Sequence, residues 1–118
     1  MPKKFMKSFK YAGEGAKHTL QTQRNIWIHI FIGIVVVLAG ALFRVSQAEL
    51  AALVLTITLV IVAEMFNTAL EELVNLIKPE YHPQAALVKN VAAAAVLVTA
   101  LSSVVVGGLI FLPKIIIW

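Results

Sequence analysis

The sequence predicts an all-α integral membrane protein, with an N-terminal amphipathic surface helix followed by three membrane-spanning helices. Hydrophobic residues make up 60% of the 118-residue chain, charged residues only 14%, and the mean hydropathy is +0.90. A soluble domain of this size could not bury so much apolar surface. Three apolar segments are each near the length of about 20 residues that a helix needs to cross a bilayer. They lie at residues 26–43, 50–77 and 90–112.

Residues 1–24 carry a different pattern, in which apolar side chains recur at helical spacing and lysines supply a polar side. This pattern is typical of a helix that lies along a membrane surface, with its basic side toward anionic lipid headgroups. A frayed basic tail is the alternative interpretation. The apolar positions are Phe5, Phe9, Ala12, Ala16 and Leu20.

The distribution of positive charge predicts the orientation of the chain. Six of the ten Lys and Arg residues precede residue 25, and Lys78 and Lys89 lie between the second and third apolar segments. Arg44 and Lys114 flank the opposite ends of the segments. Because cytoplasmic loops carry an excess of Lys and Arg, we expect a cytoplasmic N-terminus. The connections are short, so residues 1–118 should form a single domain.

Composition narrows the chemistry that the chain could perform. The absence of cysteine excludes thiol nucleophiles and zinc–thiolate sites. Neither a Walker loop nor a glycine-rich kinase loop is present. Aspartate is also absent, so carboxylate chemistry must come from glutamate. The six glutamates are Glu14, Glu49, Glu64, Glu71, Glu72 and Glu80.

Polar residues form a stripe within the second apolar segment, in the stretch EMFNTALEELVN at residues 64–75. Glu64, Asn67, Glu71 and Asn75 follow one another at spacings that place them on one helix face, whereas Glu72 falls outside it. A carboxylate in hydrocarbon costs at least about 2.5 kcal/mol, and such residues usually face a bundle interior and mark function. The stripe therefore predicts a buried polar site.

The residues alone leave several interpretations of this stripe open. It could be structural, with amides hydrogen-bonding across helices and Glu64 protonated. It could also form a cation site, a proton relay, or a general base beside a metal ligand. Lys89 could bind phosphate at the membrane interface, or its positive charge could serve only to orient the chain in the membrane. His29, on a largely apolar helix, is expected to make an interhelical hydrogen bond rather than to bind metal.

Two long stretches resemble the bacterial diacylglycerol kinase and undecaprenol kinase family. They are EMFNTALEELVNLIKPEYHPQAALVKNVAAAAVLVTA and SFKYAGEGAKHTLQTQRNIWIH, and together they cover most of the chain. Members of that family are small homotrimeric enzymes of the bacterial cytoplasmic membrane that phosphorylate a lipid alcohol with Mg-ATP. The resemblance implies the same fold and activity here, with Mg²⁺ as cofactor, ATP as co-substrate and no nucleic acid as partner.

The resemblance also implies a role for individual side chains. Glu64 would be the general base that accepts the lipid hydroxyl proton, and Asn67 would help to position the phosphoryl group. Glu71 would hold magnesium together with Gln23. The positions that would bind the nucleotide are Tyr11, Gln23, Lys89 and Asn90.

The chain departs from the family pattern at four positions. Amides stand at Gln23, Asn75 and Asn90, where the family has acids, and Trp27 stands where arginine is common. A catalytically weak or silent relative that binds lipid or nucleotide is therefore the alternative function, and a small cation- or proton-conducting protein is the third. The stretches RNIWIH and KPEYHP resemble the undecaprenol kinase branch of the family more than the other branch, and this resemblance favours undecaprenol over diacylglycerol as the acceptor.

Overall fold

The computed structural model describes residues 2–117, which form four α-helices and no strand within that range. The helices are α1 (Pro2–Thr22), α2 (Arg24–Leu42), α3 (Gln47–Ile77) and α4 (Pro83–Ile117). Three of them, α2, α3 and α4, are long and apolar enough to cross a membrane. The predicted fold class, an all-α multi-pass membrane protein, is confirmed.

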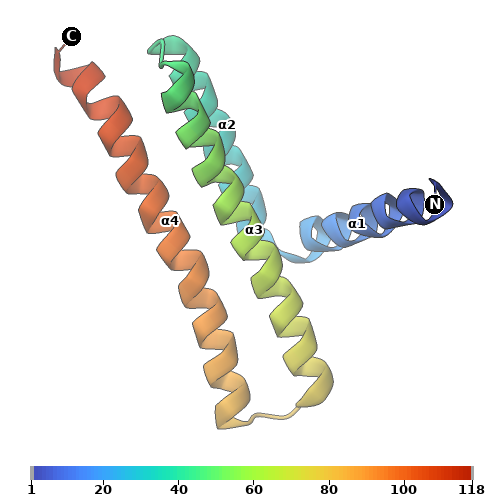
Figure 1. The fold of residues 1–118 in the computed structure, drawn as a ribbon. Coiled ribbons are helices and arrows are strands. Elements are labelled where there is room, and N and C mark those ends of the chain that lie inside the picture. Colours follow the sequence, from blue (N-terminus) through green and yellow to red (C-terminus); the bar gives the residue numbers. More distant parts are fainter. Residues whose placement is uncertain (1, 118) are drawn as a thin grey trace.

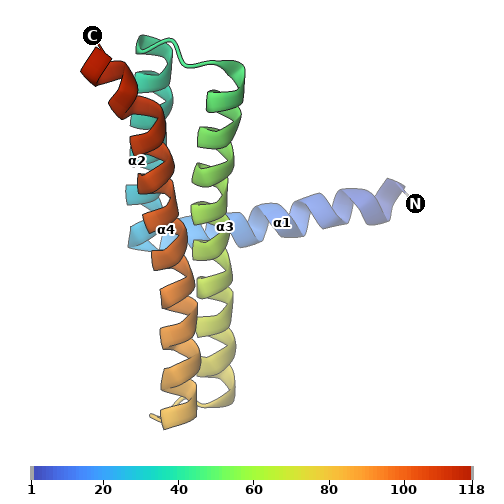
Figure 2. The ribbon, with the colours of Figure 1, turned by 60° about the vertical axis from the view of Figure 1, so that its left-hand side comes forward.

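The membrane-spanning helices are arranged around α3, which contacts each of the other three helices. Figure 1 shows α2 and α3 side by side, with α4 returning along α3. Helix α1 projects sideways from this bundle, and the turned view in Figure 2 shows the same arrangement. Apart from the buried Thr19, α1 is largely exposed, as a helix on a membrane surface should be.

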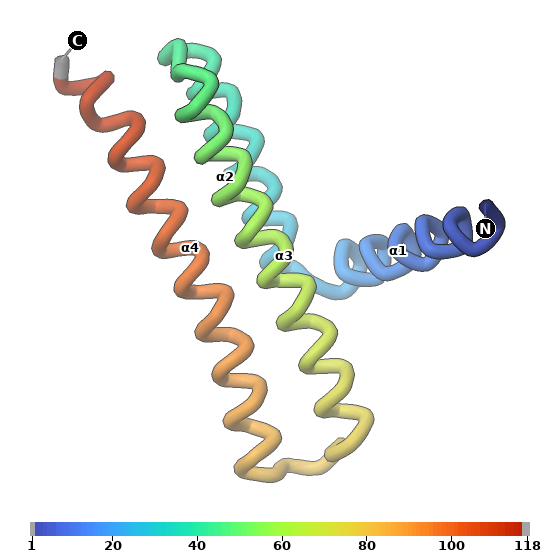
Figure 3. The backbone as a smooth tube through the Cα atoms, viewed as in Figure 1, coloured from blue at the N-terminus to red at the C-terminus, as the bar shows by residue number. Residues whose placement is uncertain are grey.

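Helices α3 and α4 are much longer than α2. At 1.5 Å per residue, the 31 residues of α3 span about 46 Å, whereas the 19 residues of α2 span about 28 Å. The tube in Figure 3 shows that α3 and α4 continue past the corner where α1 meets α2. The connection between α3 and α4 therefore lies well beyond the level of α1.

The ends of α3 and α4 differ from the expected ranges for identifiable reasons. Helix α3 begins at Gln47 because Ser46 and Glu49 form a reciprocal capping box. Helix α4 begins at Pro83 rather than near residue 90, since proline suits the first position of a helix. It also continues beyond Pro113. There Lys114 donates to both carboxylate oxygens of Glu49, at 2.9 and 3.0 Å, and so fastens this end of α4 to α3.

A glycine allows α2 and α3 to approach each other closely. Gly33 is buried in α2, and a Cβ atom at this position would lie 2.9 Å from Cγ2 of Ile57 in α3. A Cβ atom added at Gly107 in α4 would have no described atom of another residue within 4 Å, apart from its chain neighbours and the backbone of its own helix. The two glycines therefore provide a matched pair for testing helix contact.

We expect Gly33→Ala to destabilise the protein, by an amount on the order of 1 kcal/mol, because overpacking forces neighbouring side chains to shift. Gly107→Ala should be neutral or stabilising, since alanine favours a helix over glycine by up to about 1 kcal/mol. Unfolding of both variants in detergent micelles, followed by circular dichroism, measures the difference. Equal stabilisation by the two alanines would contradict the close approach of α2 and α3.

Candidate catalytic site

Glu64 is the centre of the candidate site. It lies on the buried face of α3, together with Leu53, Val60 and Thr68, and only 2% of its surface is exposed. The hydroxyl of Thr68 donates to the backbone carbonyl of Glu64 at 2.9 Å, so this threonine is satisfied within the helix. The carboxylate of Glu64 therefore needs a partner from another element.

That partner comes from α2. Nε2 of His29 lies 3.2 Å from Oε1 of Glu64, which is within ion-pair distance. The interhelical contact expected of His29 is therefore present. The sequence did not indicate that its partner would be the central glutamate, because the register of α2 on α3 is set by tertiary packing.

The next residues of the stripe offer oxygen ligands. Asn67 is partly buried, and its Oδ1 atom is the one fully buried side-chain polar atom without a hydrogen-bond partner in the described part of the chain. Glu71 follows one turn later and is also partly exposed. An unpaired buried acceptor is costly, so it indicates a missing donor or cation.

These donors suit magnesium. Within residues 2–117, no group of three or more His, Cys, Asp or Glu side chains could hold a metal ion. Mg²⁺ does not need such a cage, because it is commonly bound by one or two carboxylates, with substrate phosphates and water completing its octahedron. The carboxylate of Glu71 and the amide oxygen of Asn67 fit that requirement. Gln23, the other expected ligand, lies at the break between α1 and α2, where its side chain makes no capping hydrogen bond.

A small cavity with several polar lining residues lies at the connection between α3 and α4. Nζ of Lys89 donates to Oδ1 of Asn75 at 2.6 Å, which joins the two helices. The cavity has a volume of about 130 Å³, and Lys78, Tyr81 and His82 also contribute to its lining. Those three residues were not predicted as site residues. The only sequence signal for them was a cluster of polar residues around two prolines.

The remaining predicted nucleotide ligands are less enclosed. Tyr11 lies midway along α1 and is 62% exposed. Asn90, next to Lys89, is also exposed. Neither side chain makes a hydrogen bond to another described residue, so no such bond links them to Glu64 or Glu71 within the single chain.

Two contacts join α1 to the bundle near their shared corner, and the first of them is exposed to solvent. Nε2 of His18 lies 3.3 Å from Oε1 of Glu72, the glutamate outside the stripe, and this contact joins α1 to α3. Nε1 of Trp27 donates to the carbonyl of Leu20 at 2.7 Å and so ties the start of α2 to the end of α1. Trp27 thus has a structural role at the position where the family commonly has arginine.

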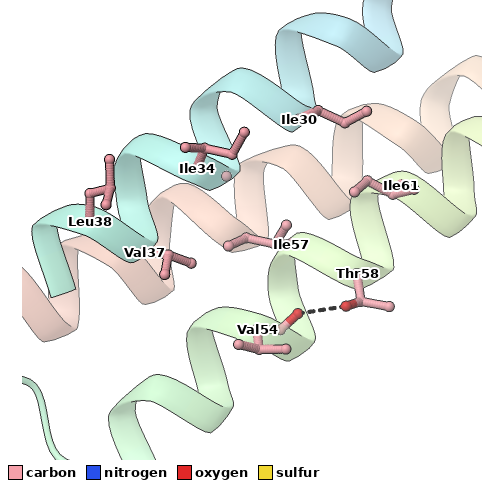
Figure 4. A pocket seen from close by; sticks show the side chains of 9 residues that line it. Ile30, Ile34, Val37, Leu38, Val54, Ile57, Thr58 and Ile61 are labelled. Atoms are coloured by element: carbon pink, nitrogen blue, oxygen red, sulfur yellow. Dashed lines mark hydrogen bonds between the residues drawn. The ribbon is translucent and has the colours of Figure 1, made fainter. Parts of the chain in front are cut away.

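An apolar groove runs along α2 and α3 away from Glu64. Its volume is about 390 Å³, and Figure 4 shows its side chains projecting from both helices. The lining residues nearest in sequence to the candidate site are Ile30, which follows His29, and Ile61, which precedes Glu64 by one helical turn. The other lining residues are Gly33, Ile34, Val37, Leu38, Val54, Ile57 and Thr58.

Comparisons with known proteins agree with this architecture. Residues 10–111 match the family model for prokaryotic diacylglycerol kinase. A protein from a Synechocystis species named diacylglycerol kinase is 42% identical over 92% of this chain, and the match spans 62% of the relative's length. A protein from Bacillus subtilis named undecaprenol kinase is 40% identical over 95% of this chain and 91% of its own. The chain therefore belongs to the prokaryotic diacylglycerol kinase family.

Proposed function

We propose that the protein transfers the γ-phosphoryl group of ATP to the hydroxyl of a membrane lipid alcohol. The observation that carries this proposal is the buried Glu64 carboxylate, which lies one helical turn beyond Ile61, a lining residue of the apolar groove between two membrane-spanning helices. A lipid chain in this groove would bring its terminal hydroxyl to the carboxylate. The names of the two relatives, which are both lipid kinases, support the same reaction.

In the proposed reaction Glu64 acts as the general base. The lipid oxygen attacks the γ-phosphorus, the bond from that phosphorus to the β,γ-bridging oxygen breaks, and ADP leaves with the bonding electron pair. The hydroxyl proton passes to the Glu64 carboxylate. Asn67 lies one turn away on the same face and would orient the phosphoryl group, so positioning and charge neutralisation supply most of the rate.

Glu71 and the Oδ1 atom of Asn67 would hold magnesium, with Gln23 as a neutral third ligand. Bound Mg²⁺ would neutralise charge on the β- and γ-phosphates. The carboxylate of Glu71 supplies the negative charge of this protein ligand set. Since the other two donors are amides, the nucleotide phosphates must provide the remaining charged oxygens.

Lys89 is placed to bind phosphate. Its described hydrogen-bond partner, Asn75, is a neutral amide, so the positive charge of the ammonium group is not cancelled by that contact. An aspartate at position 75, as the family has, would form an ion pair instead. The amide therefore preserves the attraction of Lys89 for phosphate, and the cavity beside it is the proposed entry point for the nucleotide.

The proposed acceptor is undecaprenol, and the proposed orientation has α1 and the α3–α4 connection on the cytoplasmic side. The undecaprenol kinase of Bacillus subtilis matches over 91% of its length, whereas the Synechocystis diacylglycerol kinase matches over 62%. The excess of Lys and Arg on α1 and around the α3–α4 connection supports the orientation, which places the site at the face where ATP is present.

The decisive experiment incubates purified protein in lipid vesicles with Mg²⁺ and γ-labelled ATP. Undecaprenol, diacylglycerol and a long-chain alkanol are supplied in separate reactions. Label in the lipid fraction, strongest with undecaprenol, is the expected result. Nucleotide binding without transfer to any of these alcohols would identify a catalytically silent relative instead. The assay tests this alternative because amides stand at positions 23 and 90, where the family has acids.

We further propose a homotrimer. Many large apolar side chains of α2, α3 and α4 are exposed in the single chain, and Tyr11 and Asn90 are not joined to the Glu64 site within it. A neighbouring subunit would cover part of this surface and bring additional polar groups to the stripe. Native mass spectrometry in detergent should therefore show three chains. A monomer with full activity would contradict shared sites.

A further inference from the structure

We infer that His29 is a positioning residue that holds the Glu64 carboxylate in its reactive orientation. This inference rests on the proposed function, in which Glu64 is the general base. The sequence suggested only that His29 makes a contact between helices. The structure places this histidine on the one side chain that the proposed reaction requires as a proton acceptor.

The geometry of the pair differs from that of a surface contact. The side chain of Glu64 is 3% exposed and that of His29 is 22% exposed, with 3.2 Å between Oε1 and Nε2. A buried carboxylate without a polar partner is strongly disfavoured, and attraction between polar groups is greater in such surroundings than in water. The contact should therefore restrict rotation of the Glu64 side chain.

The close approach of α2 and α3 maintains this contact. Gly33 lies four residues after His29, on the same face of α2, and it allows α2 to pack directly against Ile57. His29 engages Oε1, and a carboxylate has a second oxygen that can accept the proton of the lipid hydroxyl. If the contact is lost, the carboxylate can turn away, and a misplacement of about 1 Å can cost up to about 10²-fold in rate.

The test compares His29→Leu and His29→Gln with the original protein in the vesicle assay. His29→Leu should lower kcat by about 10- to 100-fold with little change in the KM for lipid or ATP, because it disturbs orientation rather than binding. His29→Gln retains a side-chain N–H donor and should recover part of the loss. His18→Leu is the matched control, since it removes a similar His–Glu contact at an exposed site and should change kcat by less than about threefold.

A double-mutant cycle with Glu64→Gln separates positioning from general structural damage. Once Glu64 is an amide, His29→Leu should cause no further loss of the residual activity. In unfolding experiments, the effects of the two changes on the equilibrium constant should also be non-additive, by at least about twofold. This stability cycle does not depend on kinase activity.

The outcomes distinguish the inference from the proposed function. An active protein in which His29→Leu keeps full kcat, or in which the two losses multiply independently, overturns the role of His29 while the kinase assignment stands. A protein inactive toward every alcohol overturns the kinase assignment. In that case additive effects on unfolding would also overturn the His29–Glu64 contact, whereas non-additive effects would retain it.

Discussion

Glu64→Gln is expected to lower lipid phosphorylation by about 10²-fold or more, the usual share of a general base. Glutamine has nearly the same size as glutamate, but its amide cannot accept the hydroxyl proton. The KM values for ATP and lipid should change little, because the amide removes a function needed in the transition state. Initial rates with labelled ATP at saturating lipid measure the effect.

Glu72→Gln is the control for this prediction. Glu72 lies on the same helix, also contacts a histidine, and loses its charge in the same way, but its side chain is exposed. We expect it to retain most of the activity. Equal turnover by folded Glu64→Gln and original protein would exclude Glu64 as the base and leave the buried stripe with a structural role.

Glu71→Gln is expected to raise the magnesium concentration needed for half-maximal activity by at least about tenfold. Loss of residues that merely support metal ligands commonly costs 10- to 100-fold in metal affinity, and Glu71 is proposed as a direct ligand. It is also the one acid in the proposed protein ligand set, so its removal leaves only amide oxygens. Magnesium titrations of the two proteins at saturating ATP measure the shift.

Gln23→Glu should act in the opposite direction and lower the magnesium requirement. A second carboxylate at the break between α1 and α2 would restore the ligand expected from the family. Gln21→Glu, which adds the same charge to the exposed surface of α1 close by, is the control and should leave the titration unchanged. If Gln23→Glu and Gln21→Glu behave alike, Gln23 is not a metal ligand.

The sequence predicted the elements of the fold and the face of α3 that carries the polar residues. The membrane-spanning elements follow from the length of the apolar segments. The polar face follows from periodicity, because a 3.6-residue repeat places Glu64 and Asn67 together whatever surrounds them. The partner of Glu64 could not be predicted in this way. The contact with His29 depends on the register between α2 and α3. That register is set by the packing of side chains such as Ile57 against Gly33.

Loop geometry limited the prediction at the α3–α4 connection in a similar way. Prolines such as Pro79 and Pro83 are typical of a break between helices. Pro83 instead begins α4, and this early start brings Lys89 to Asn75 across the hairpin. The cavity lined by Lys78 and His82 results from that turn. Such a cavity has no repeating pattern in the sequence by which it could be recognised.

In the proposed orientation, the unequal lengths of the helices would place one end of the site in water and the other within the membrane. At 1.5 Å per residue, the 11 residues from Glu64 to Asn75 separate these positions by about 16 Å along α3. In the proposed orientation, the overhanging hairpin would place Asn75 in water, while Glu64 would lie at the depth of the lipid substrate. In the proposed reaction the lipid therefore stays in the membrane and the nucleotide stays in water. Only the phosphoryl end of the nucleotide has to extend along α3 toward Glu64.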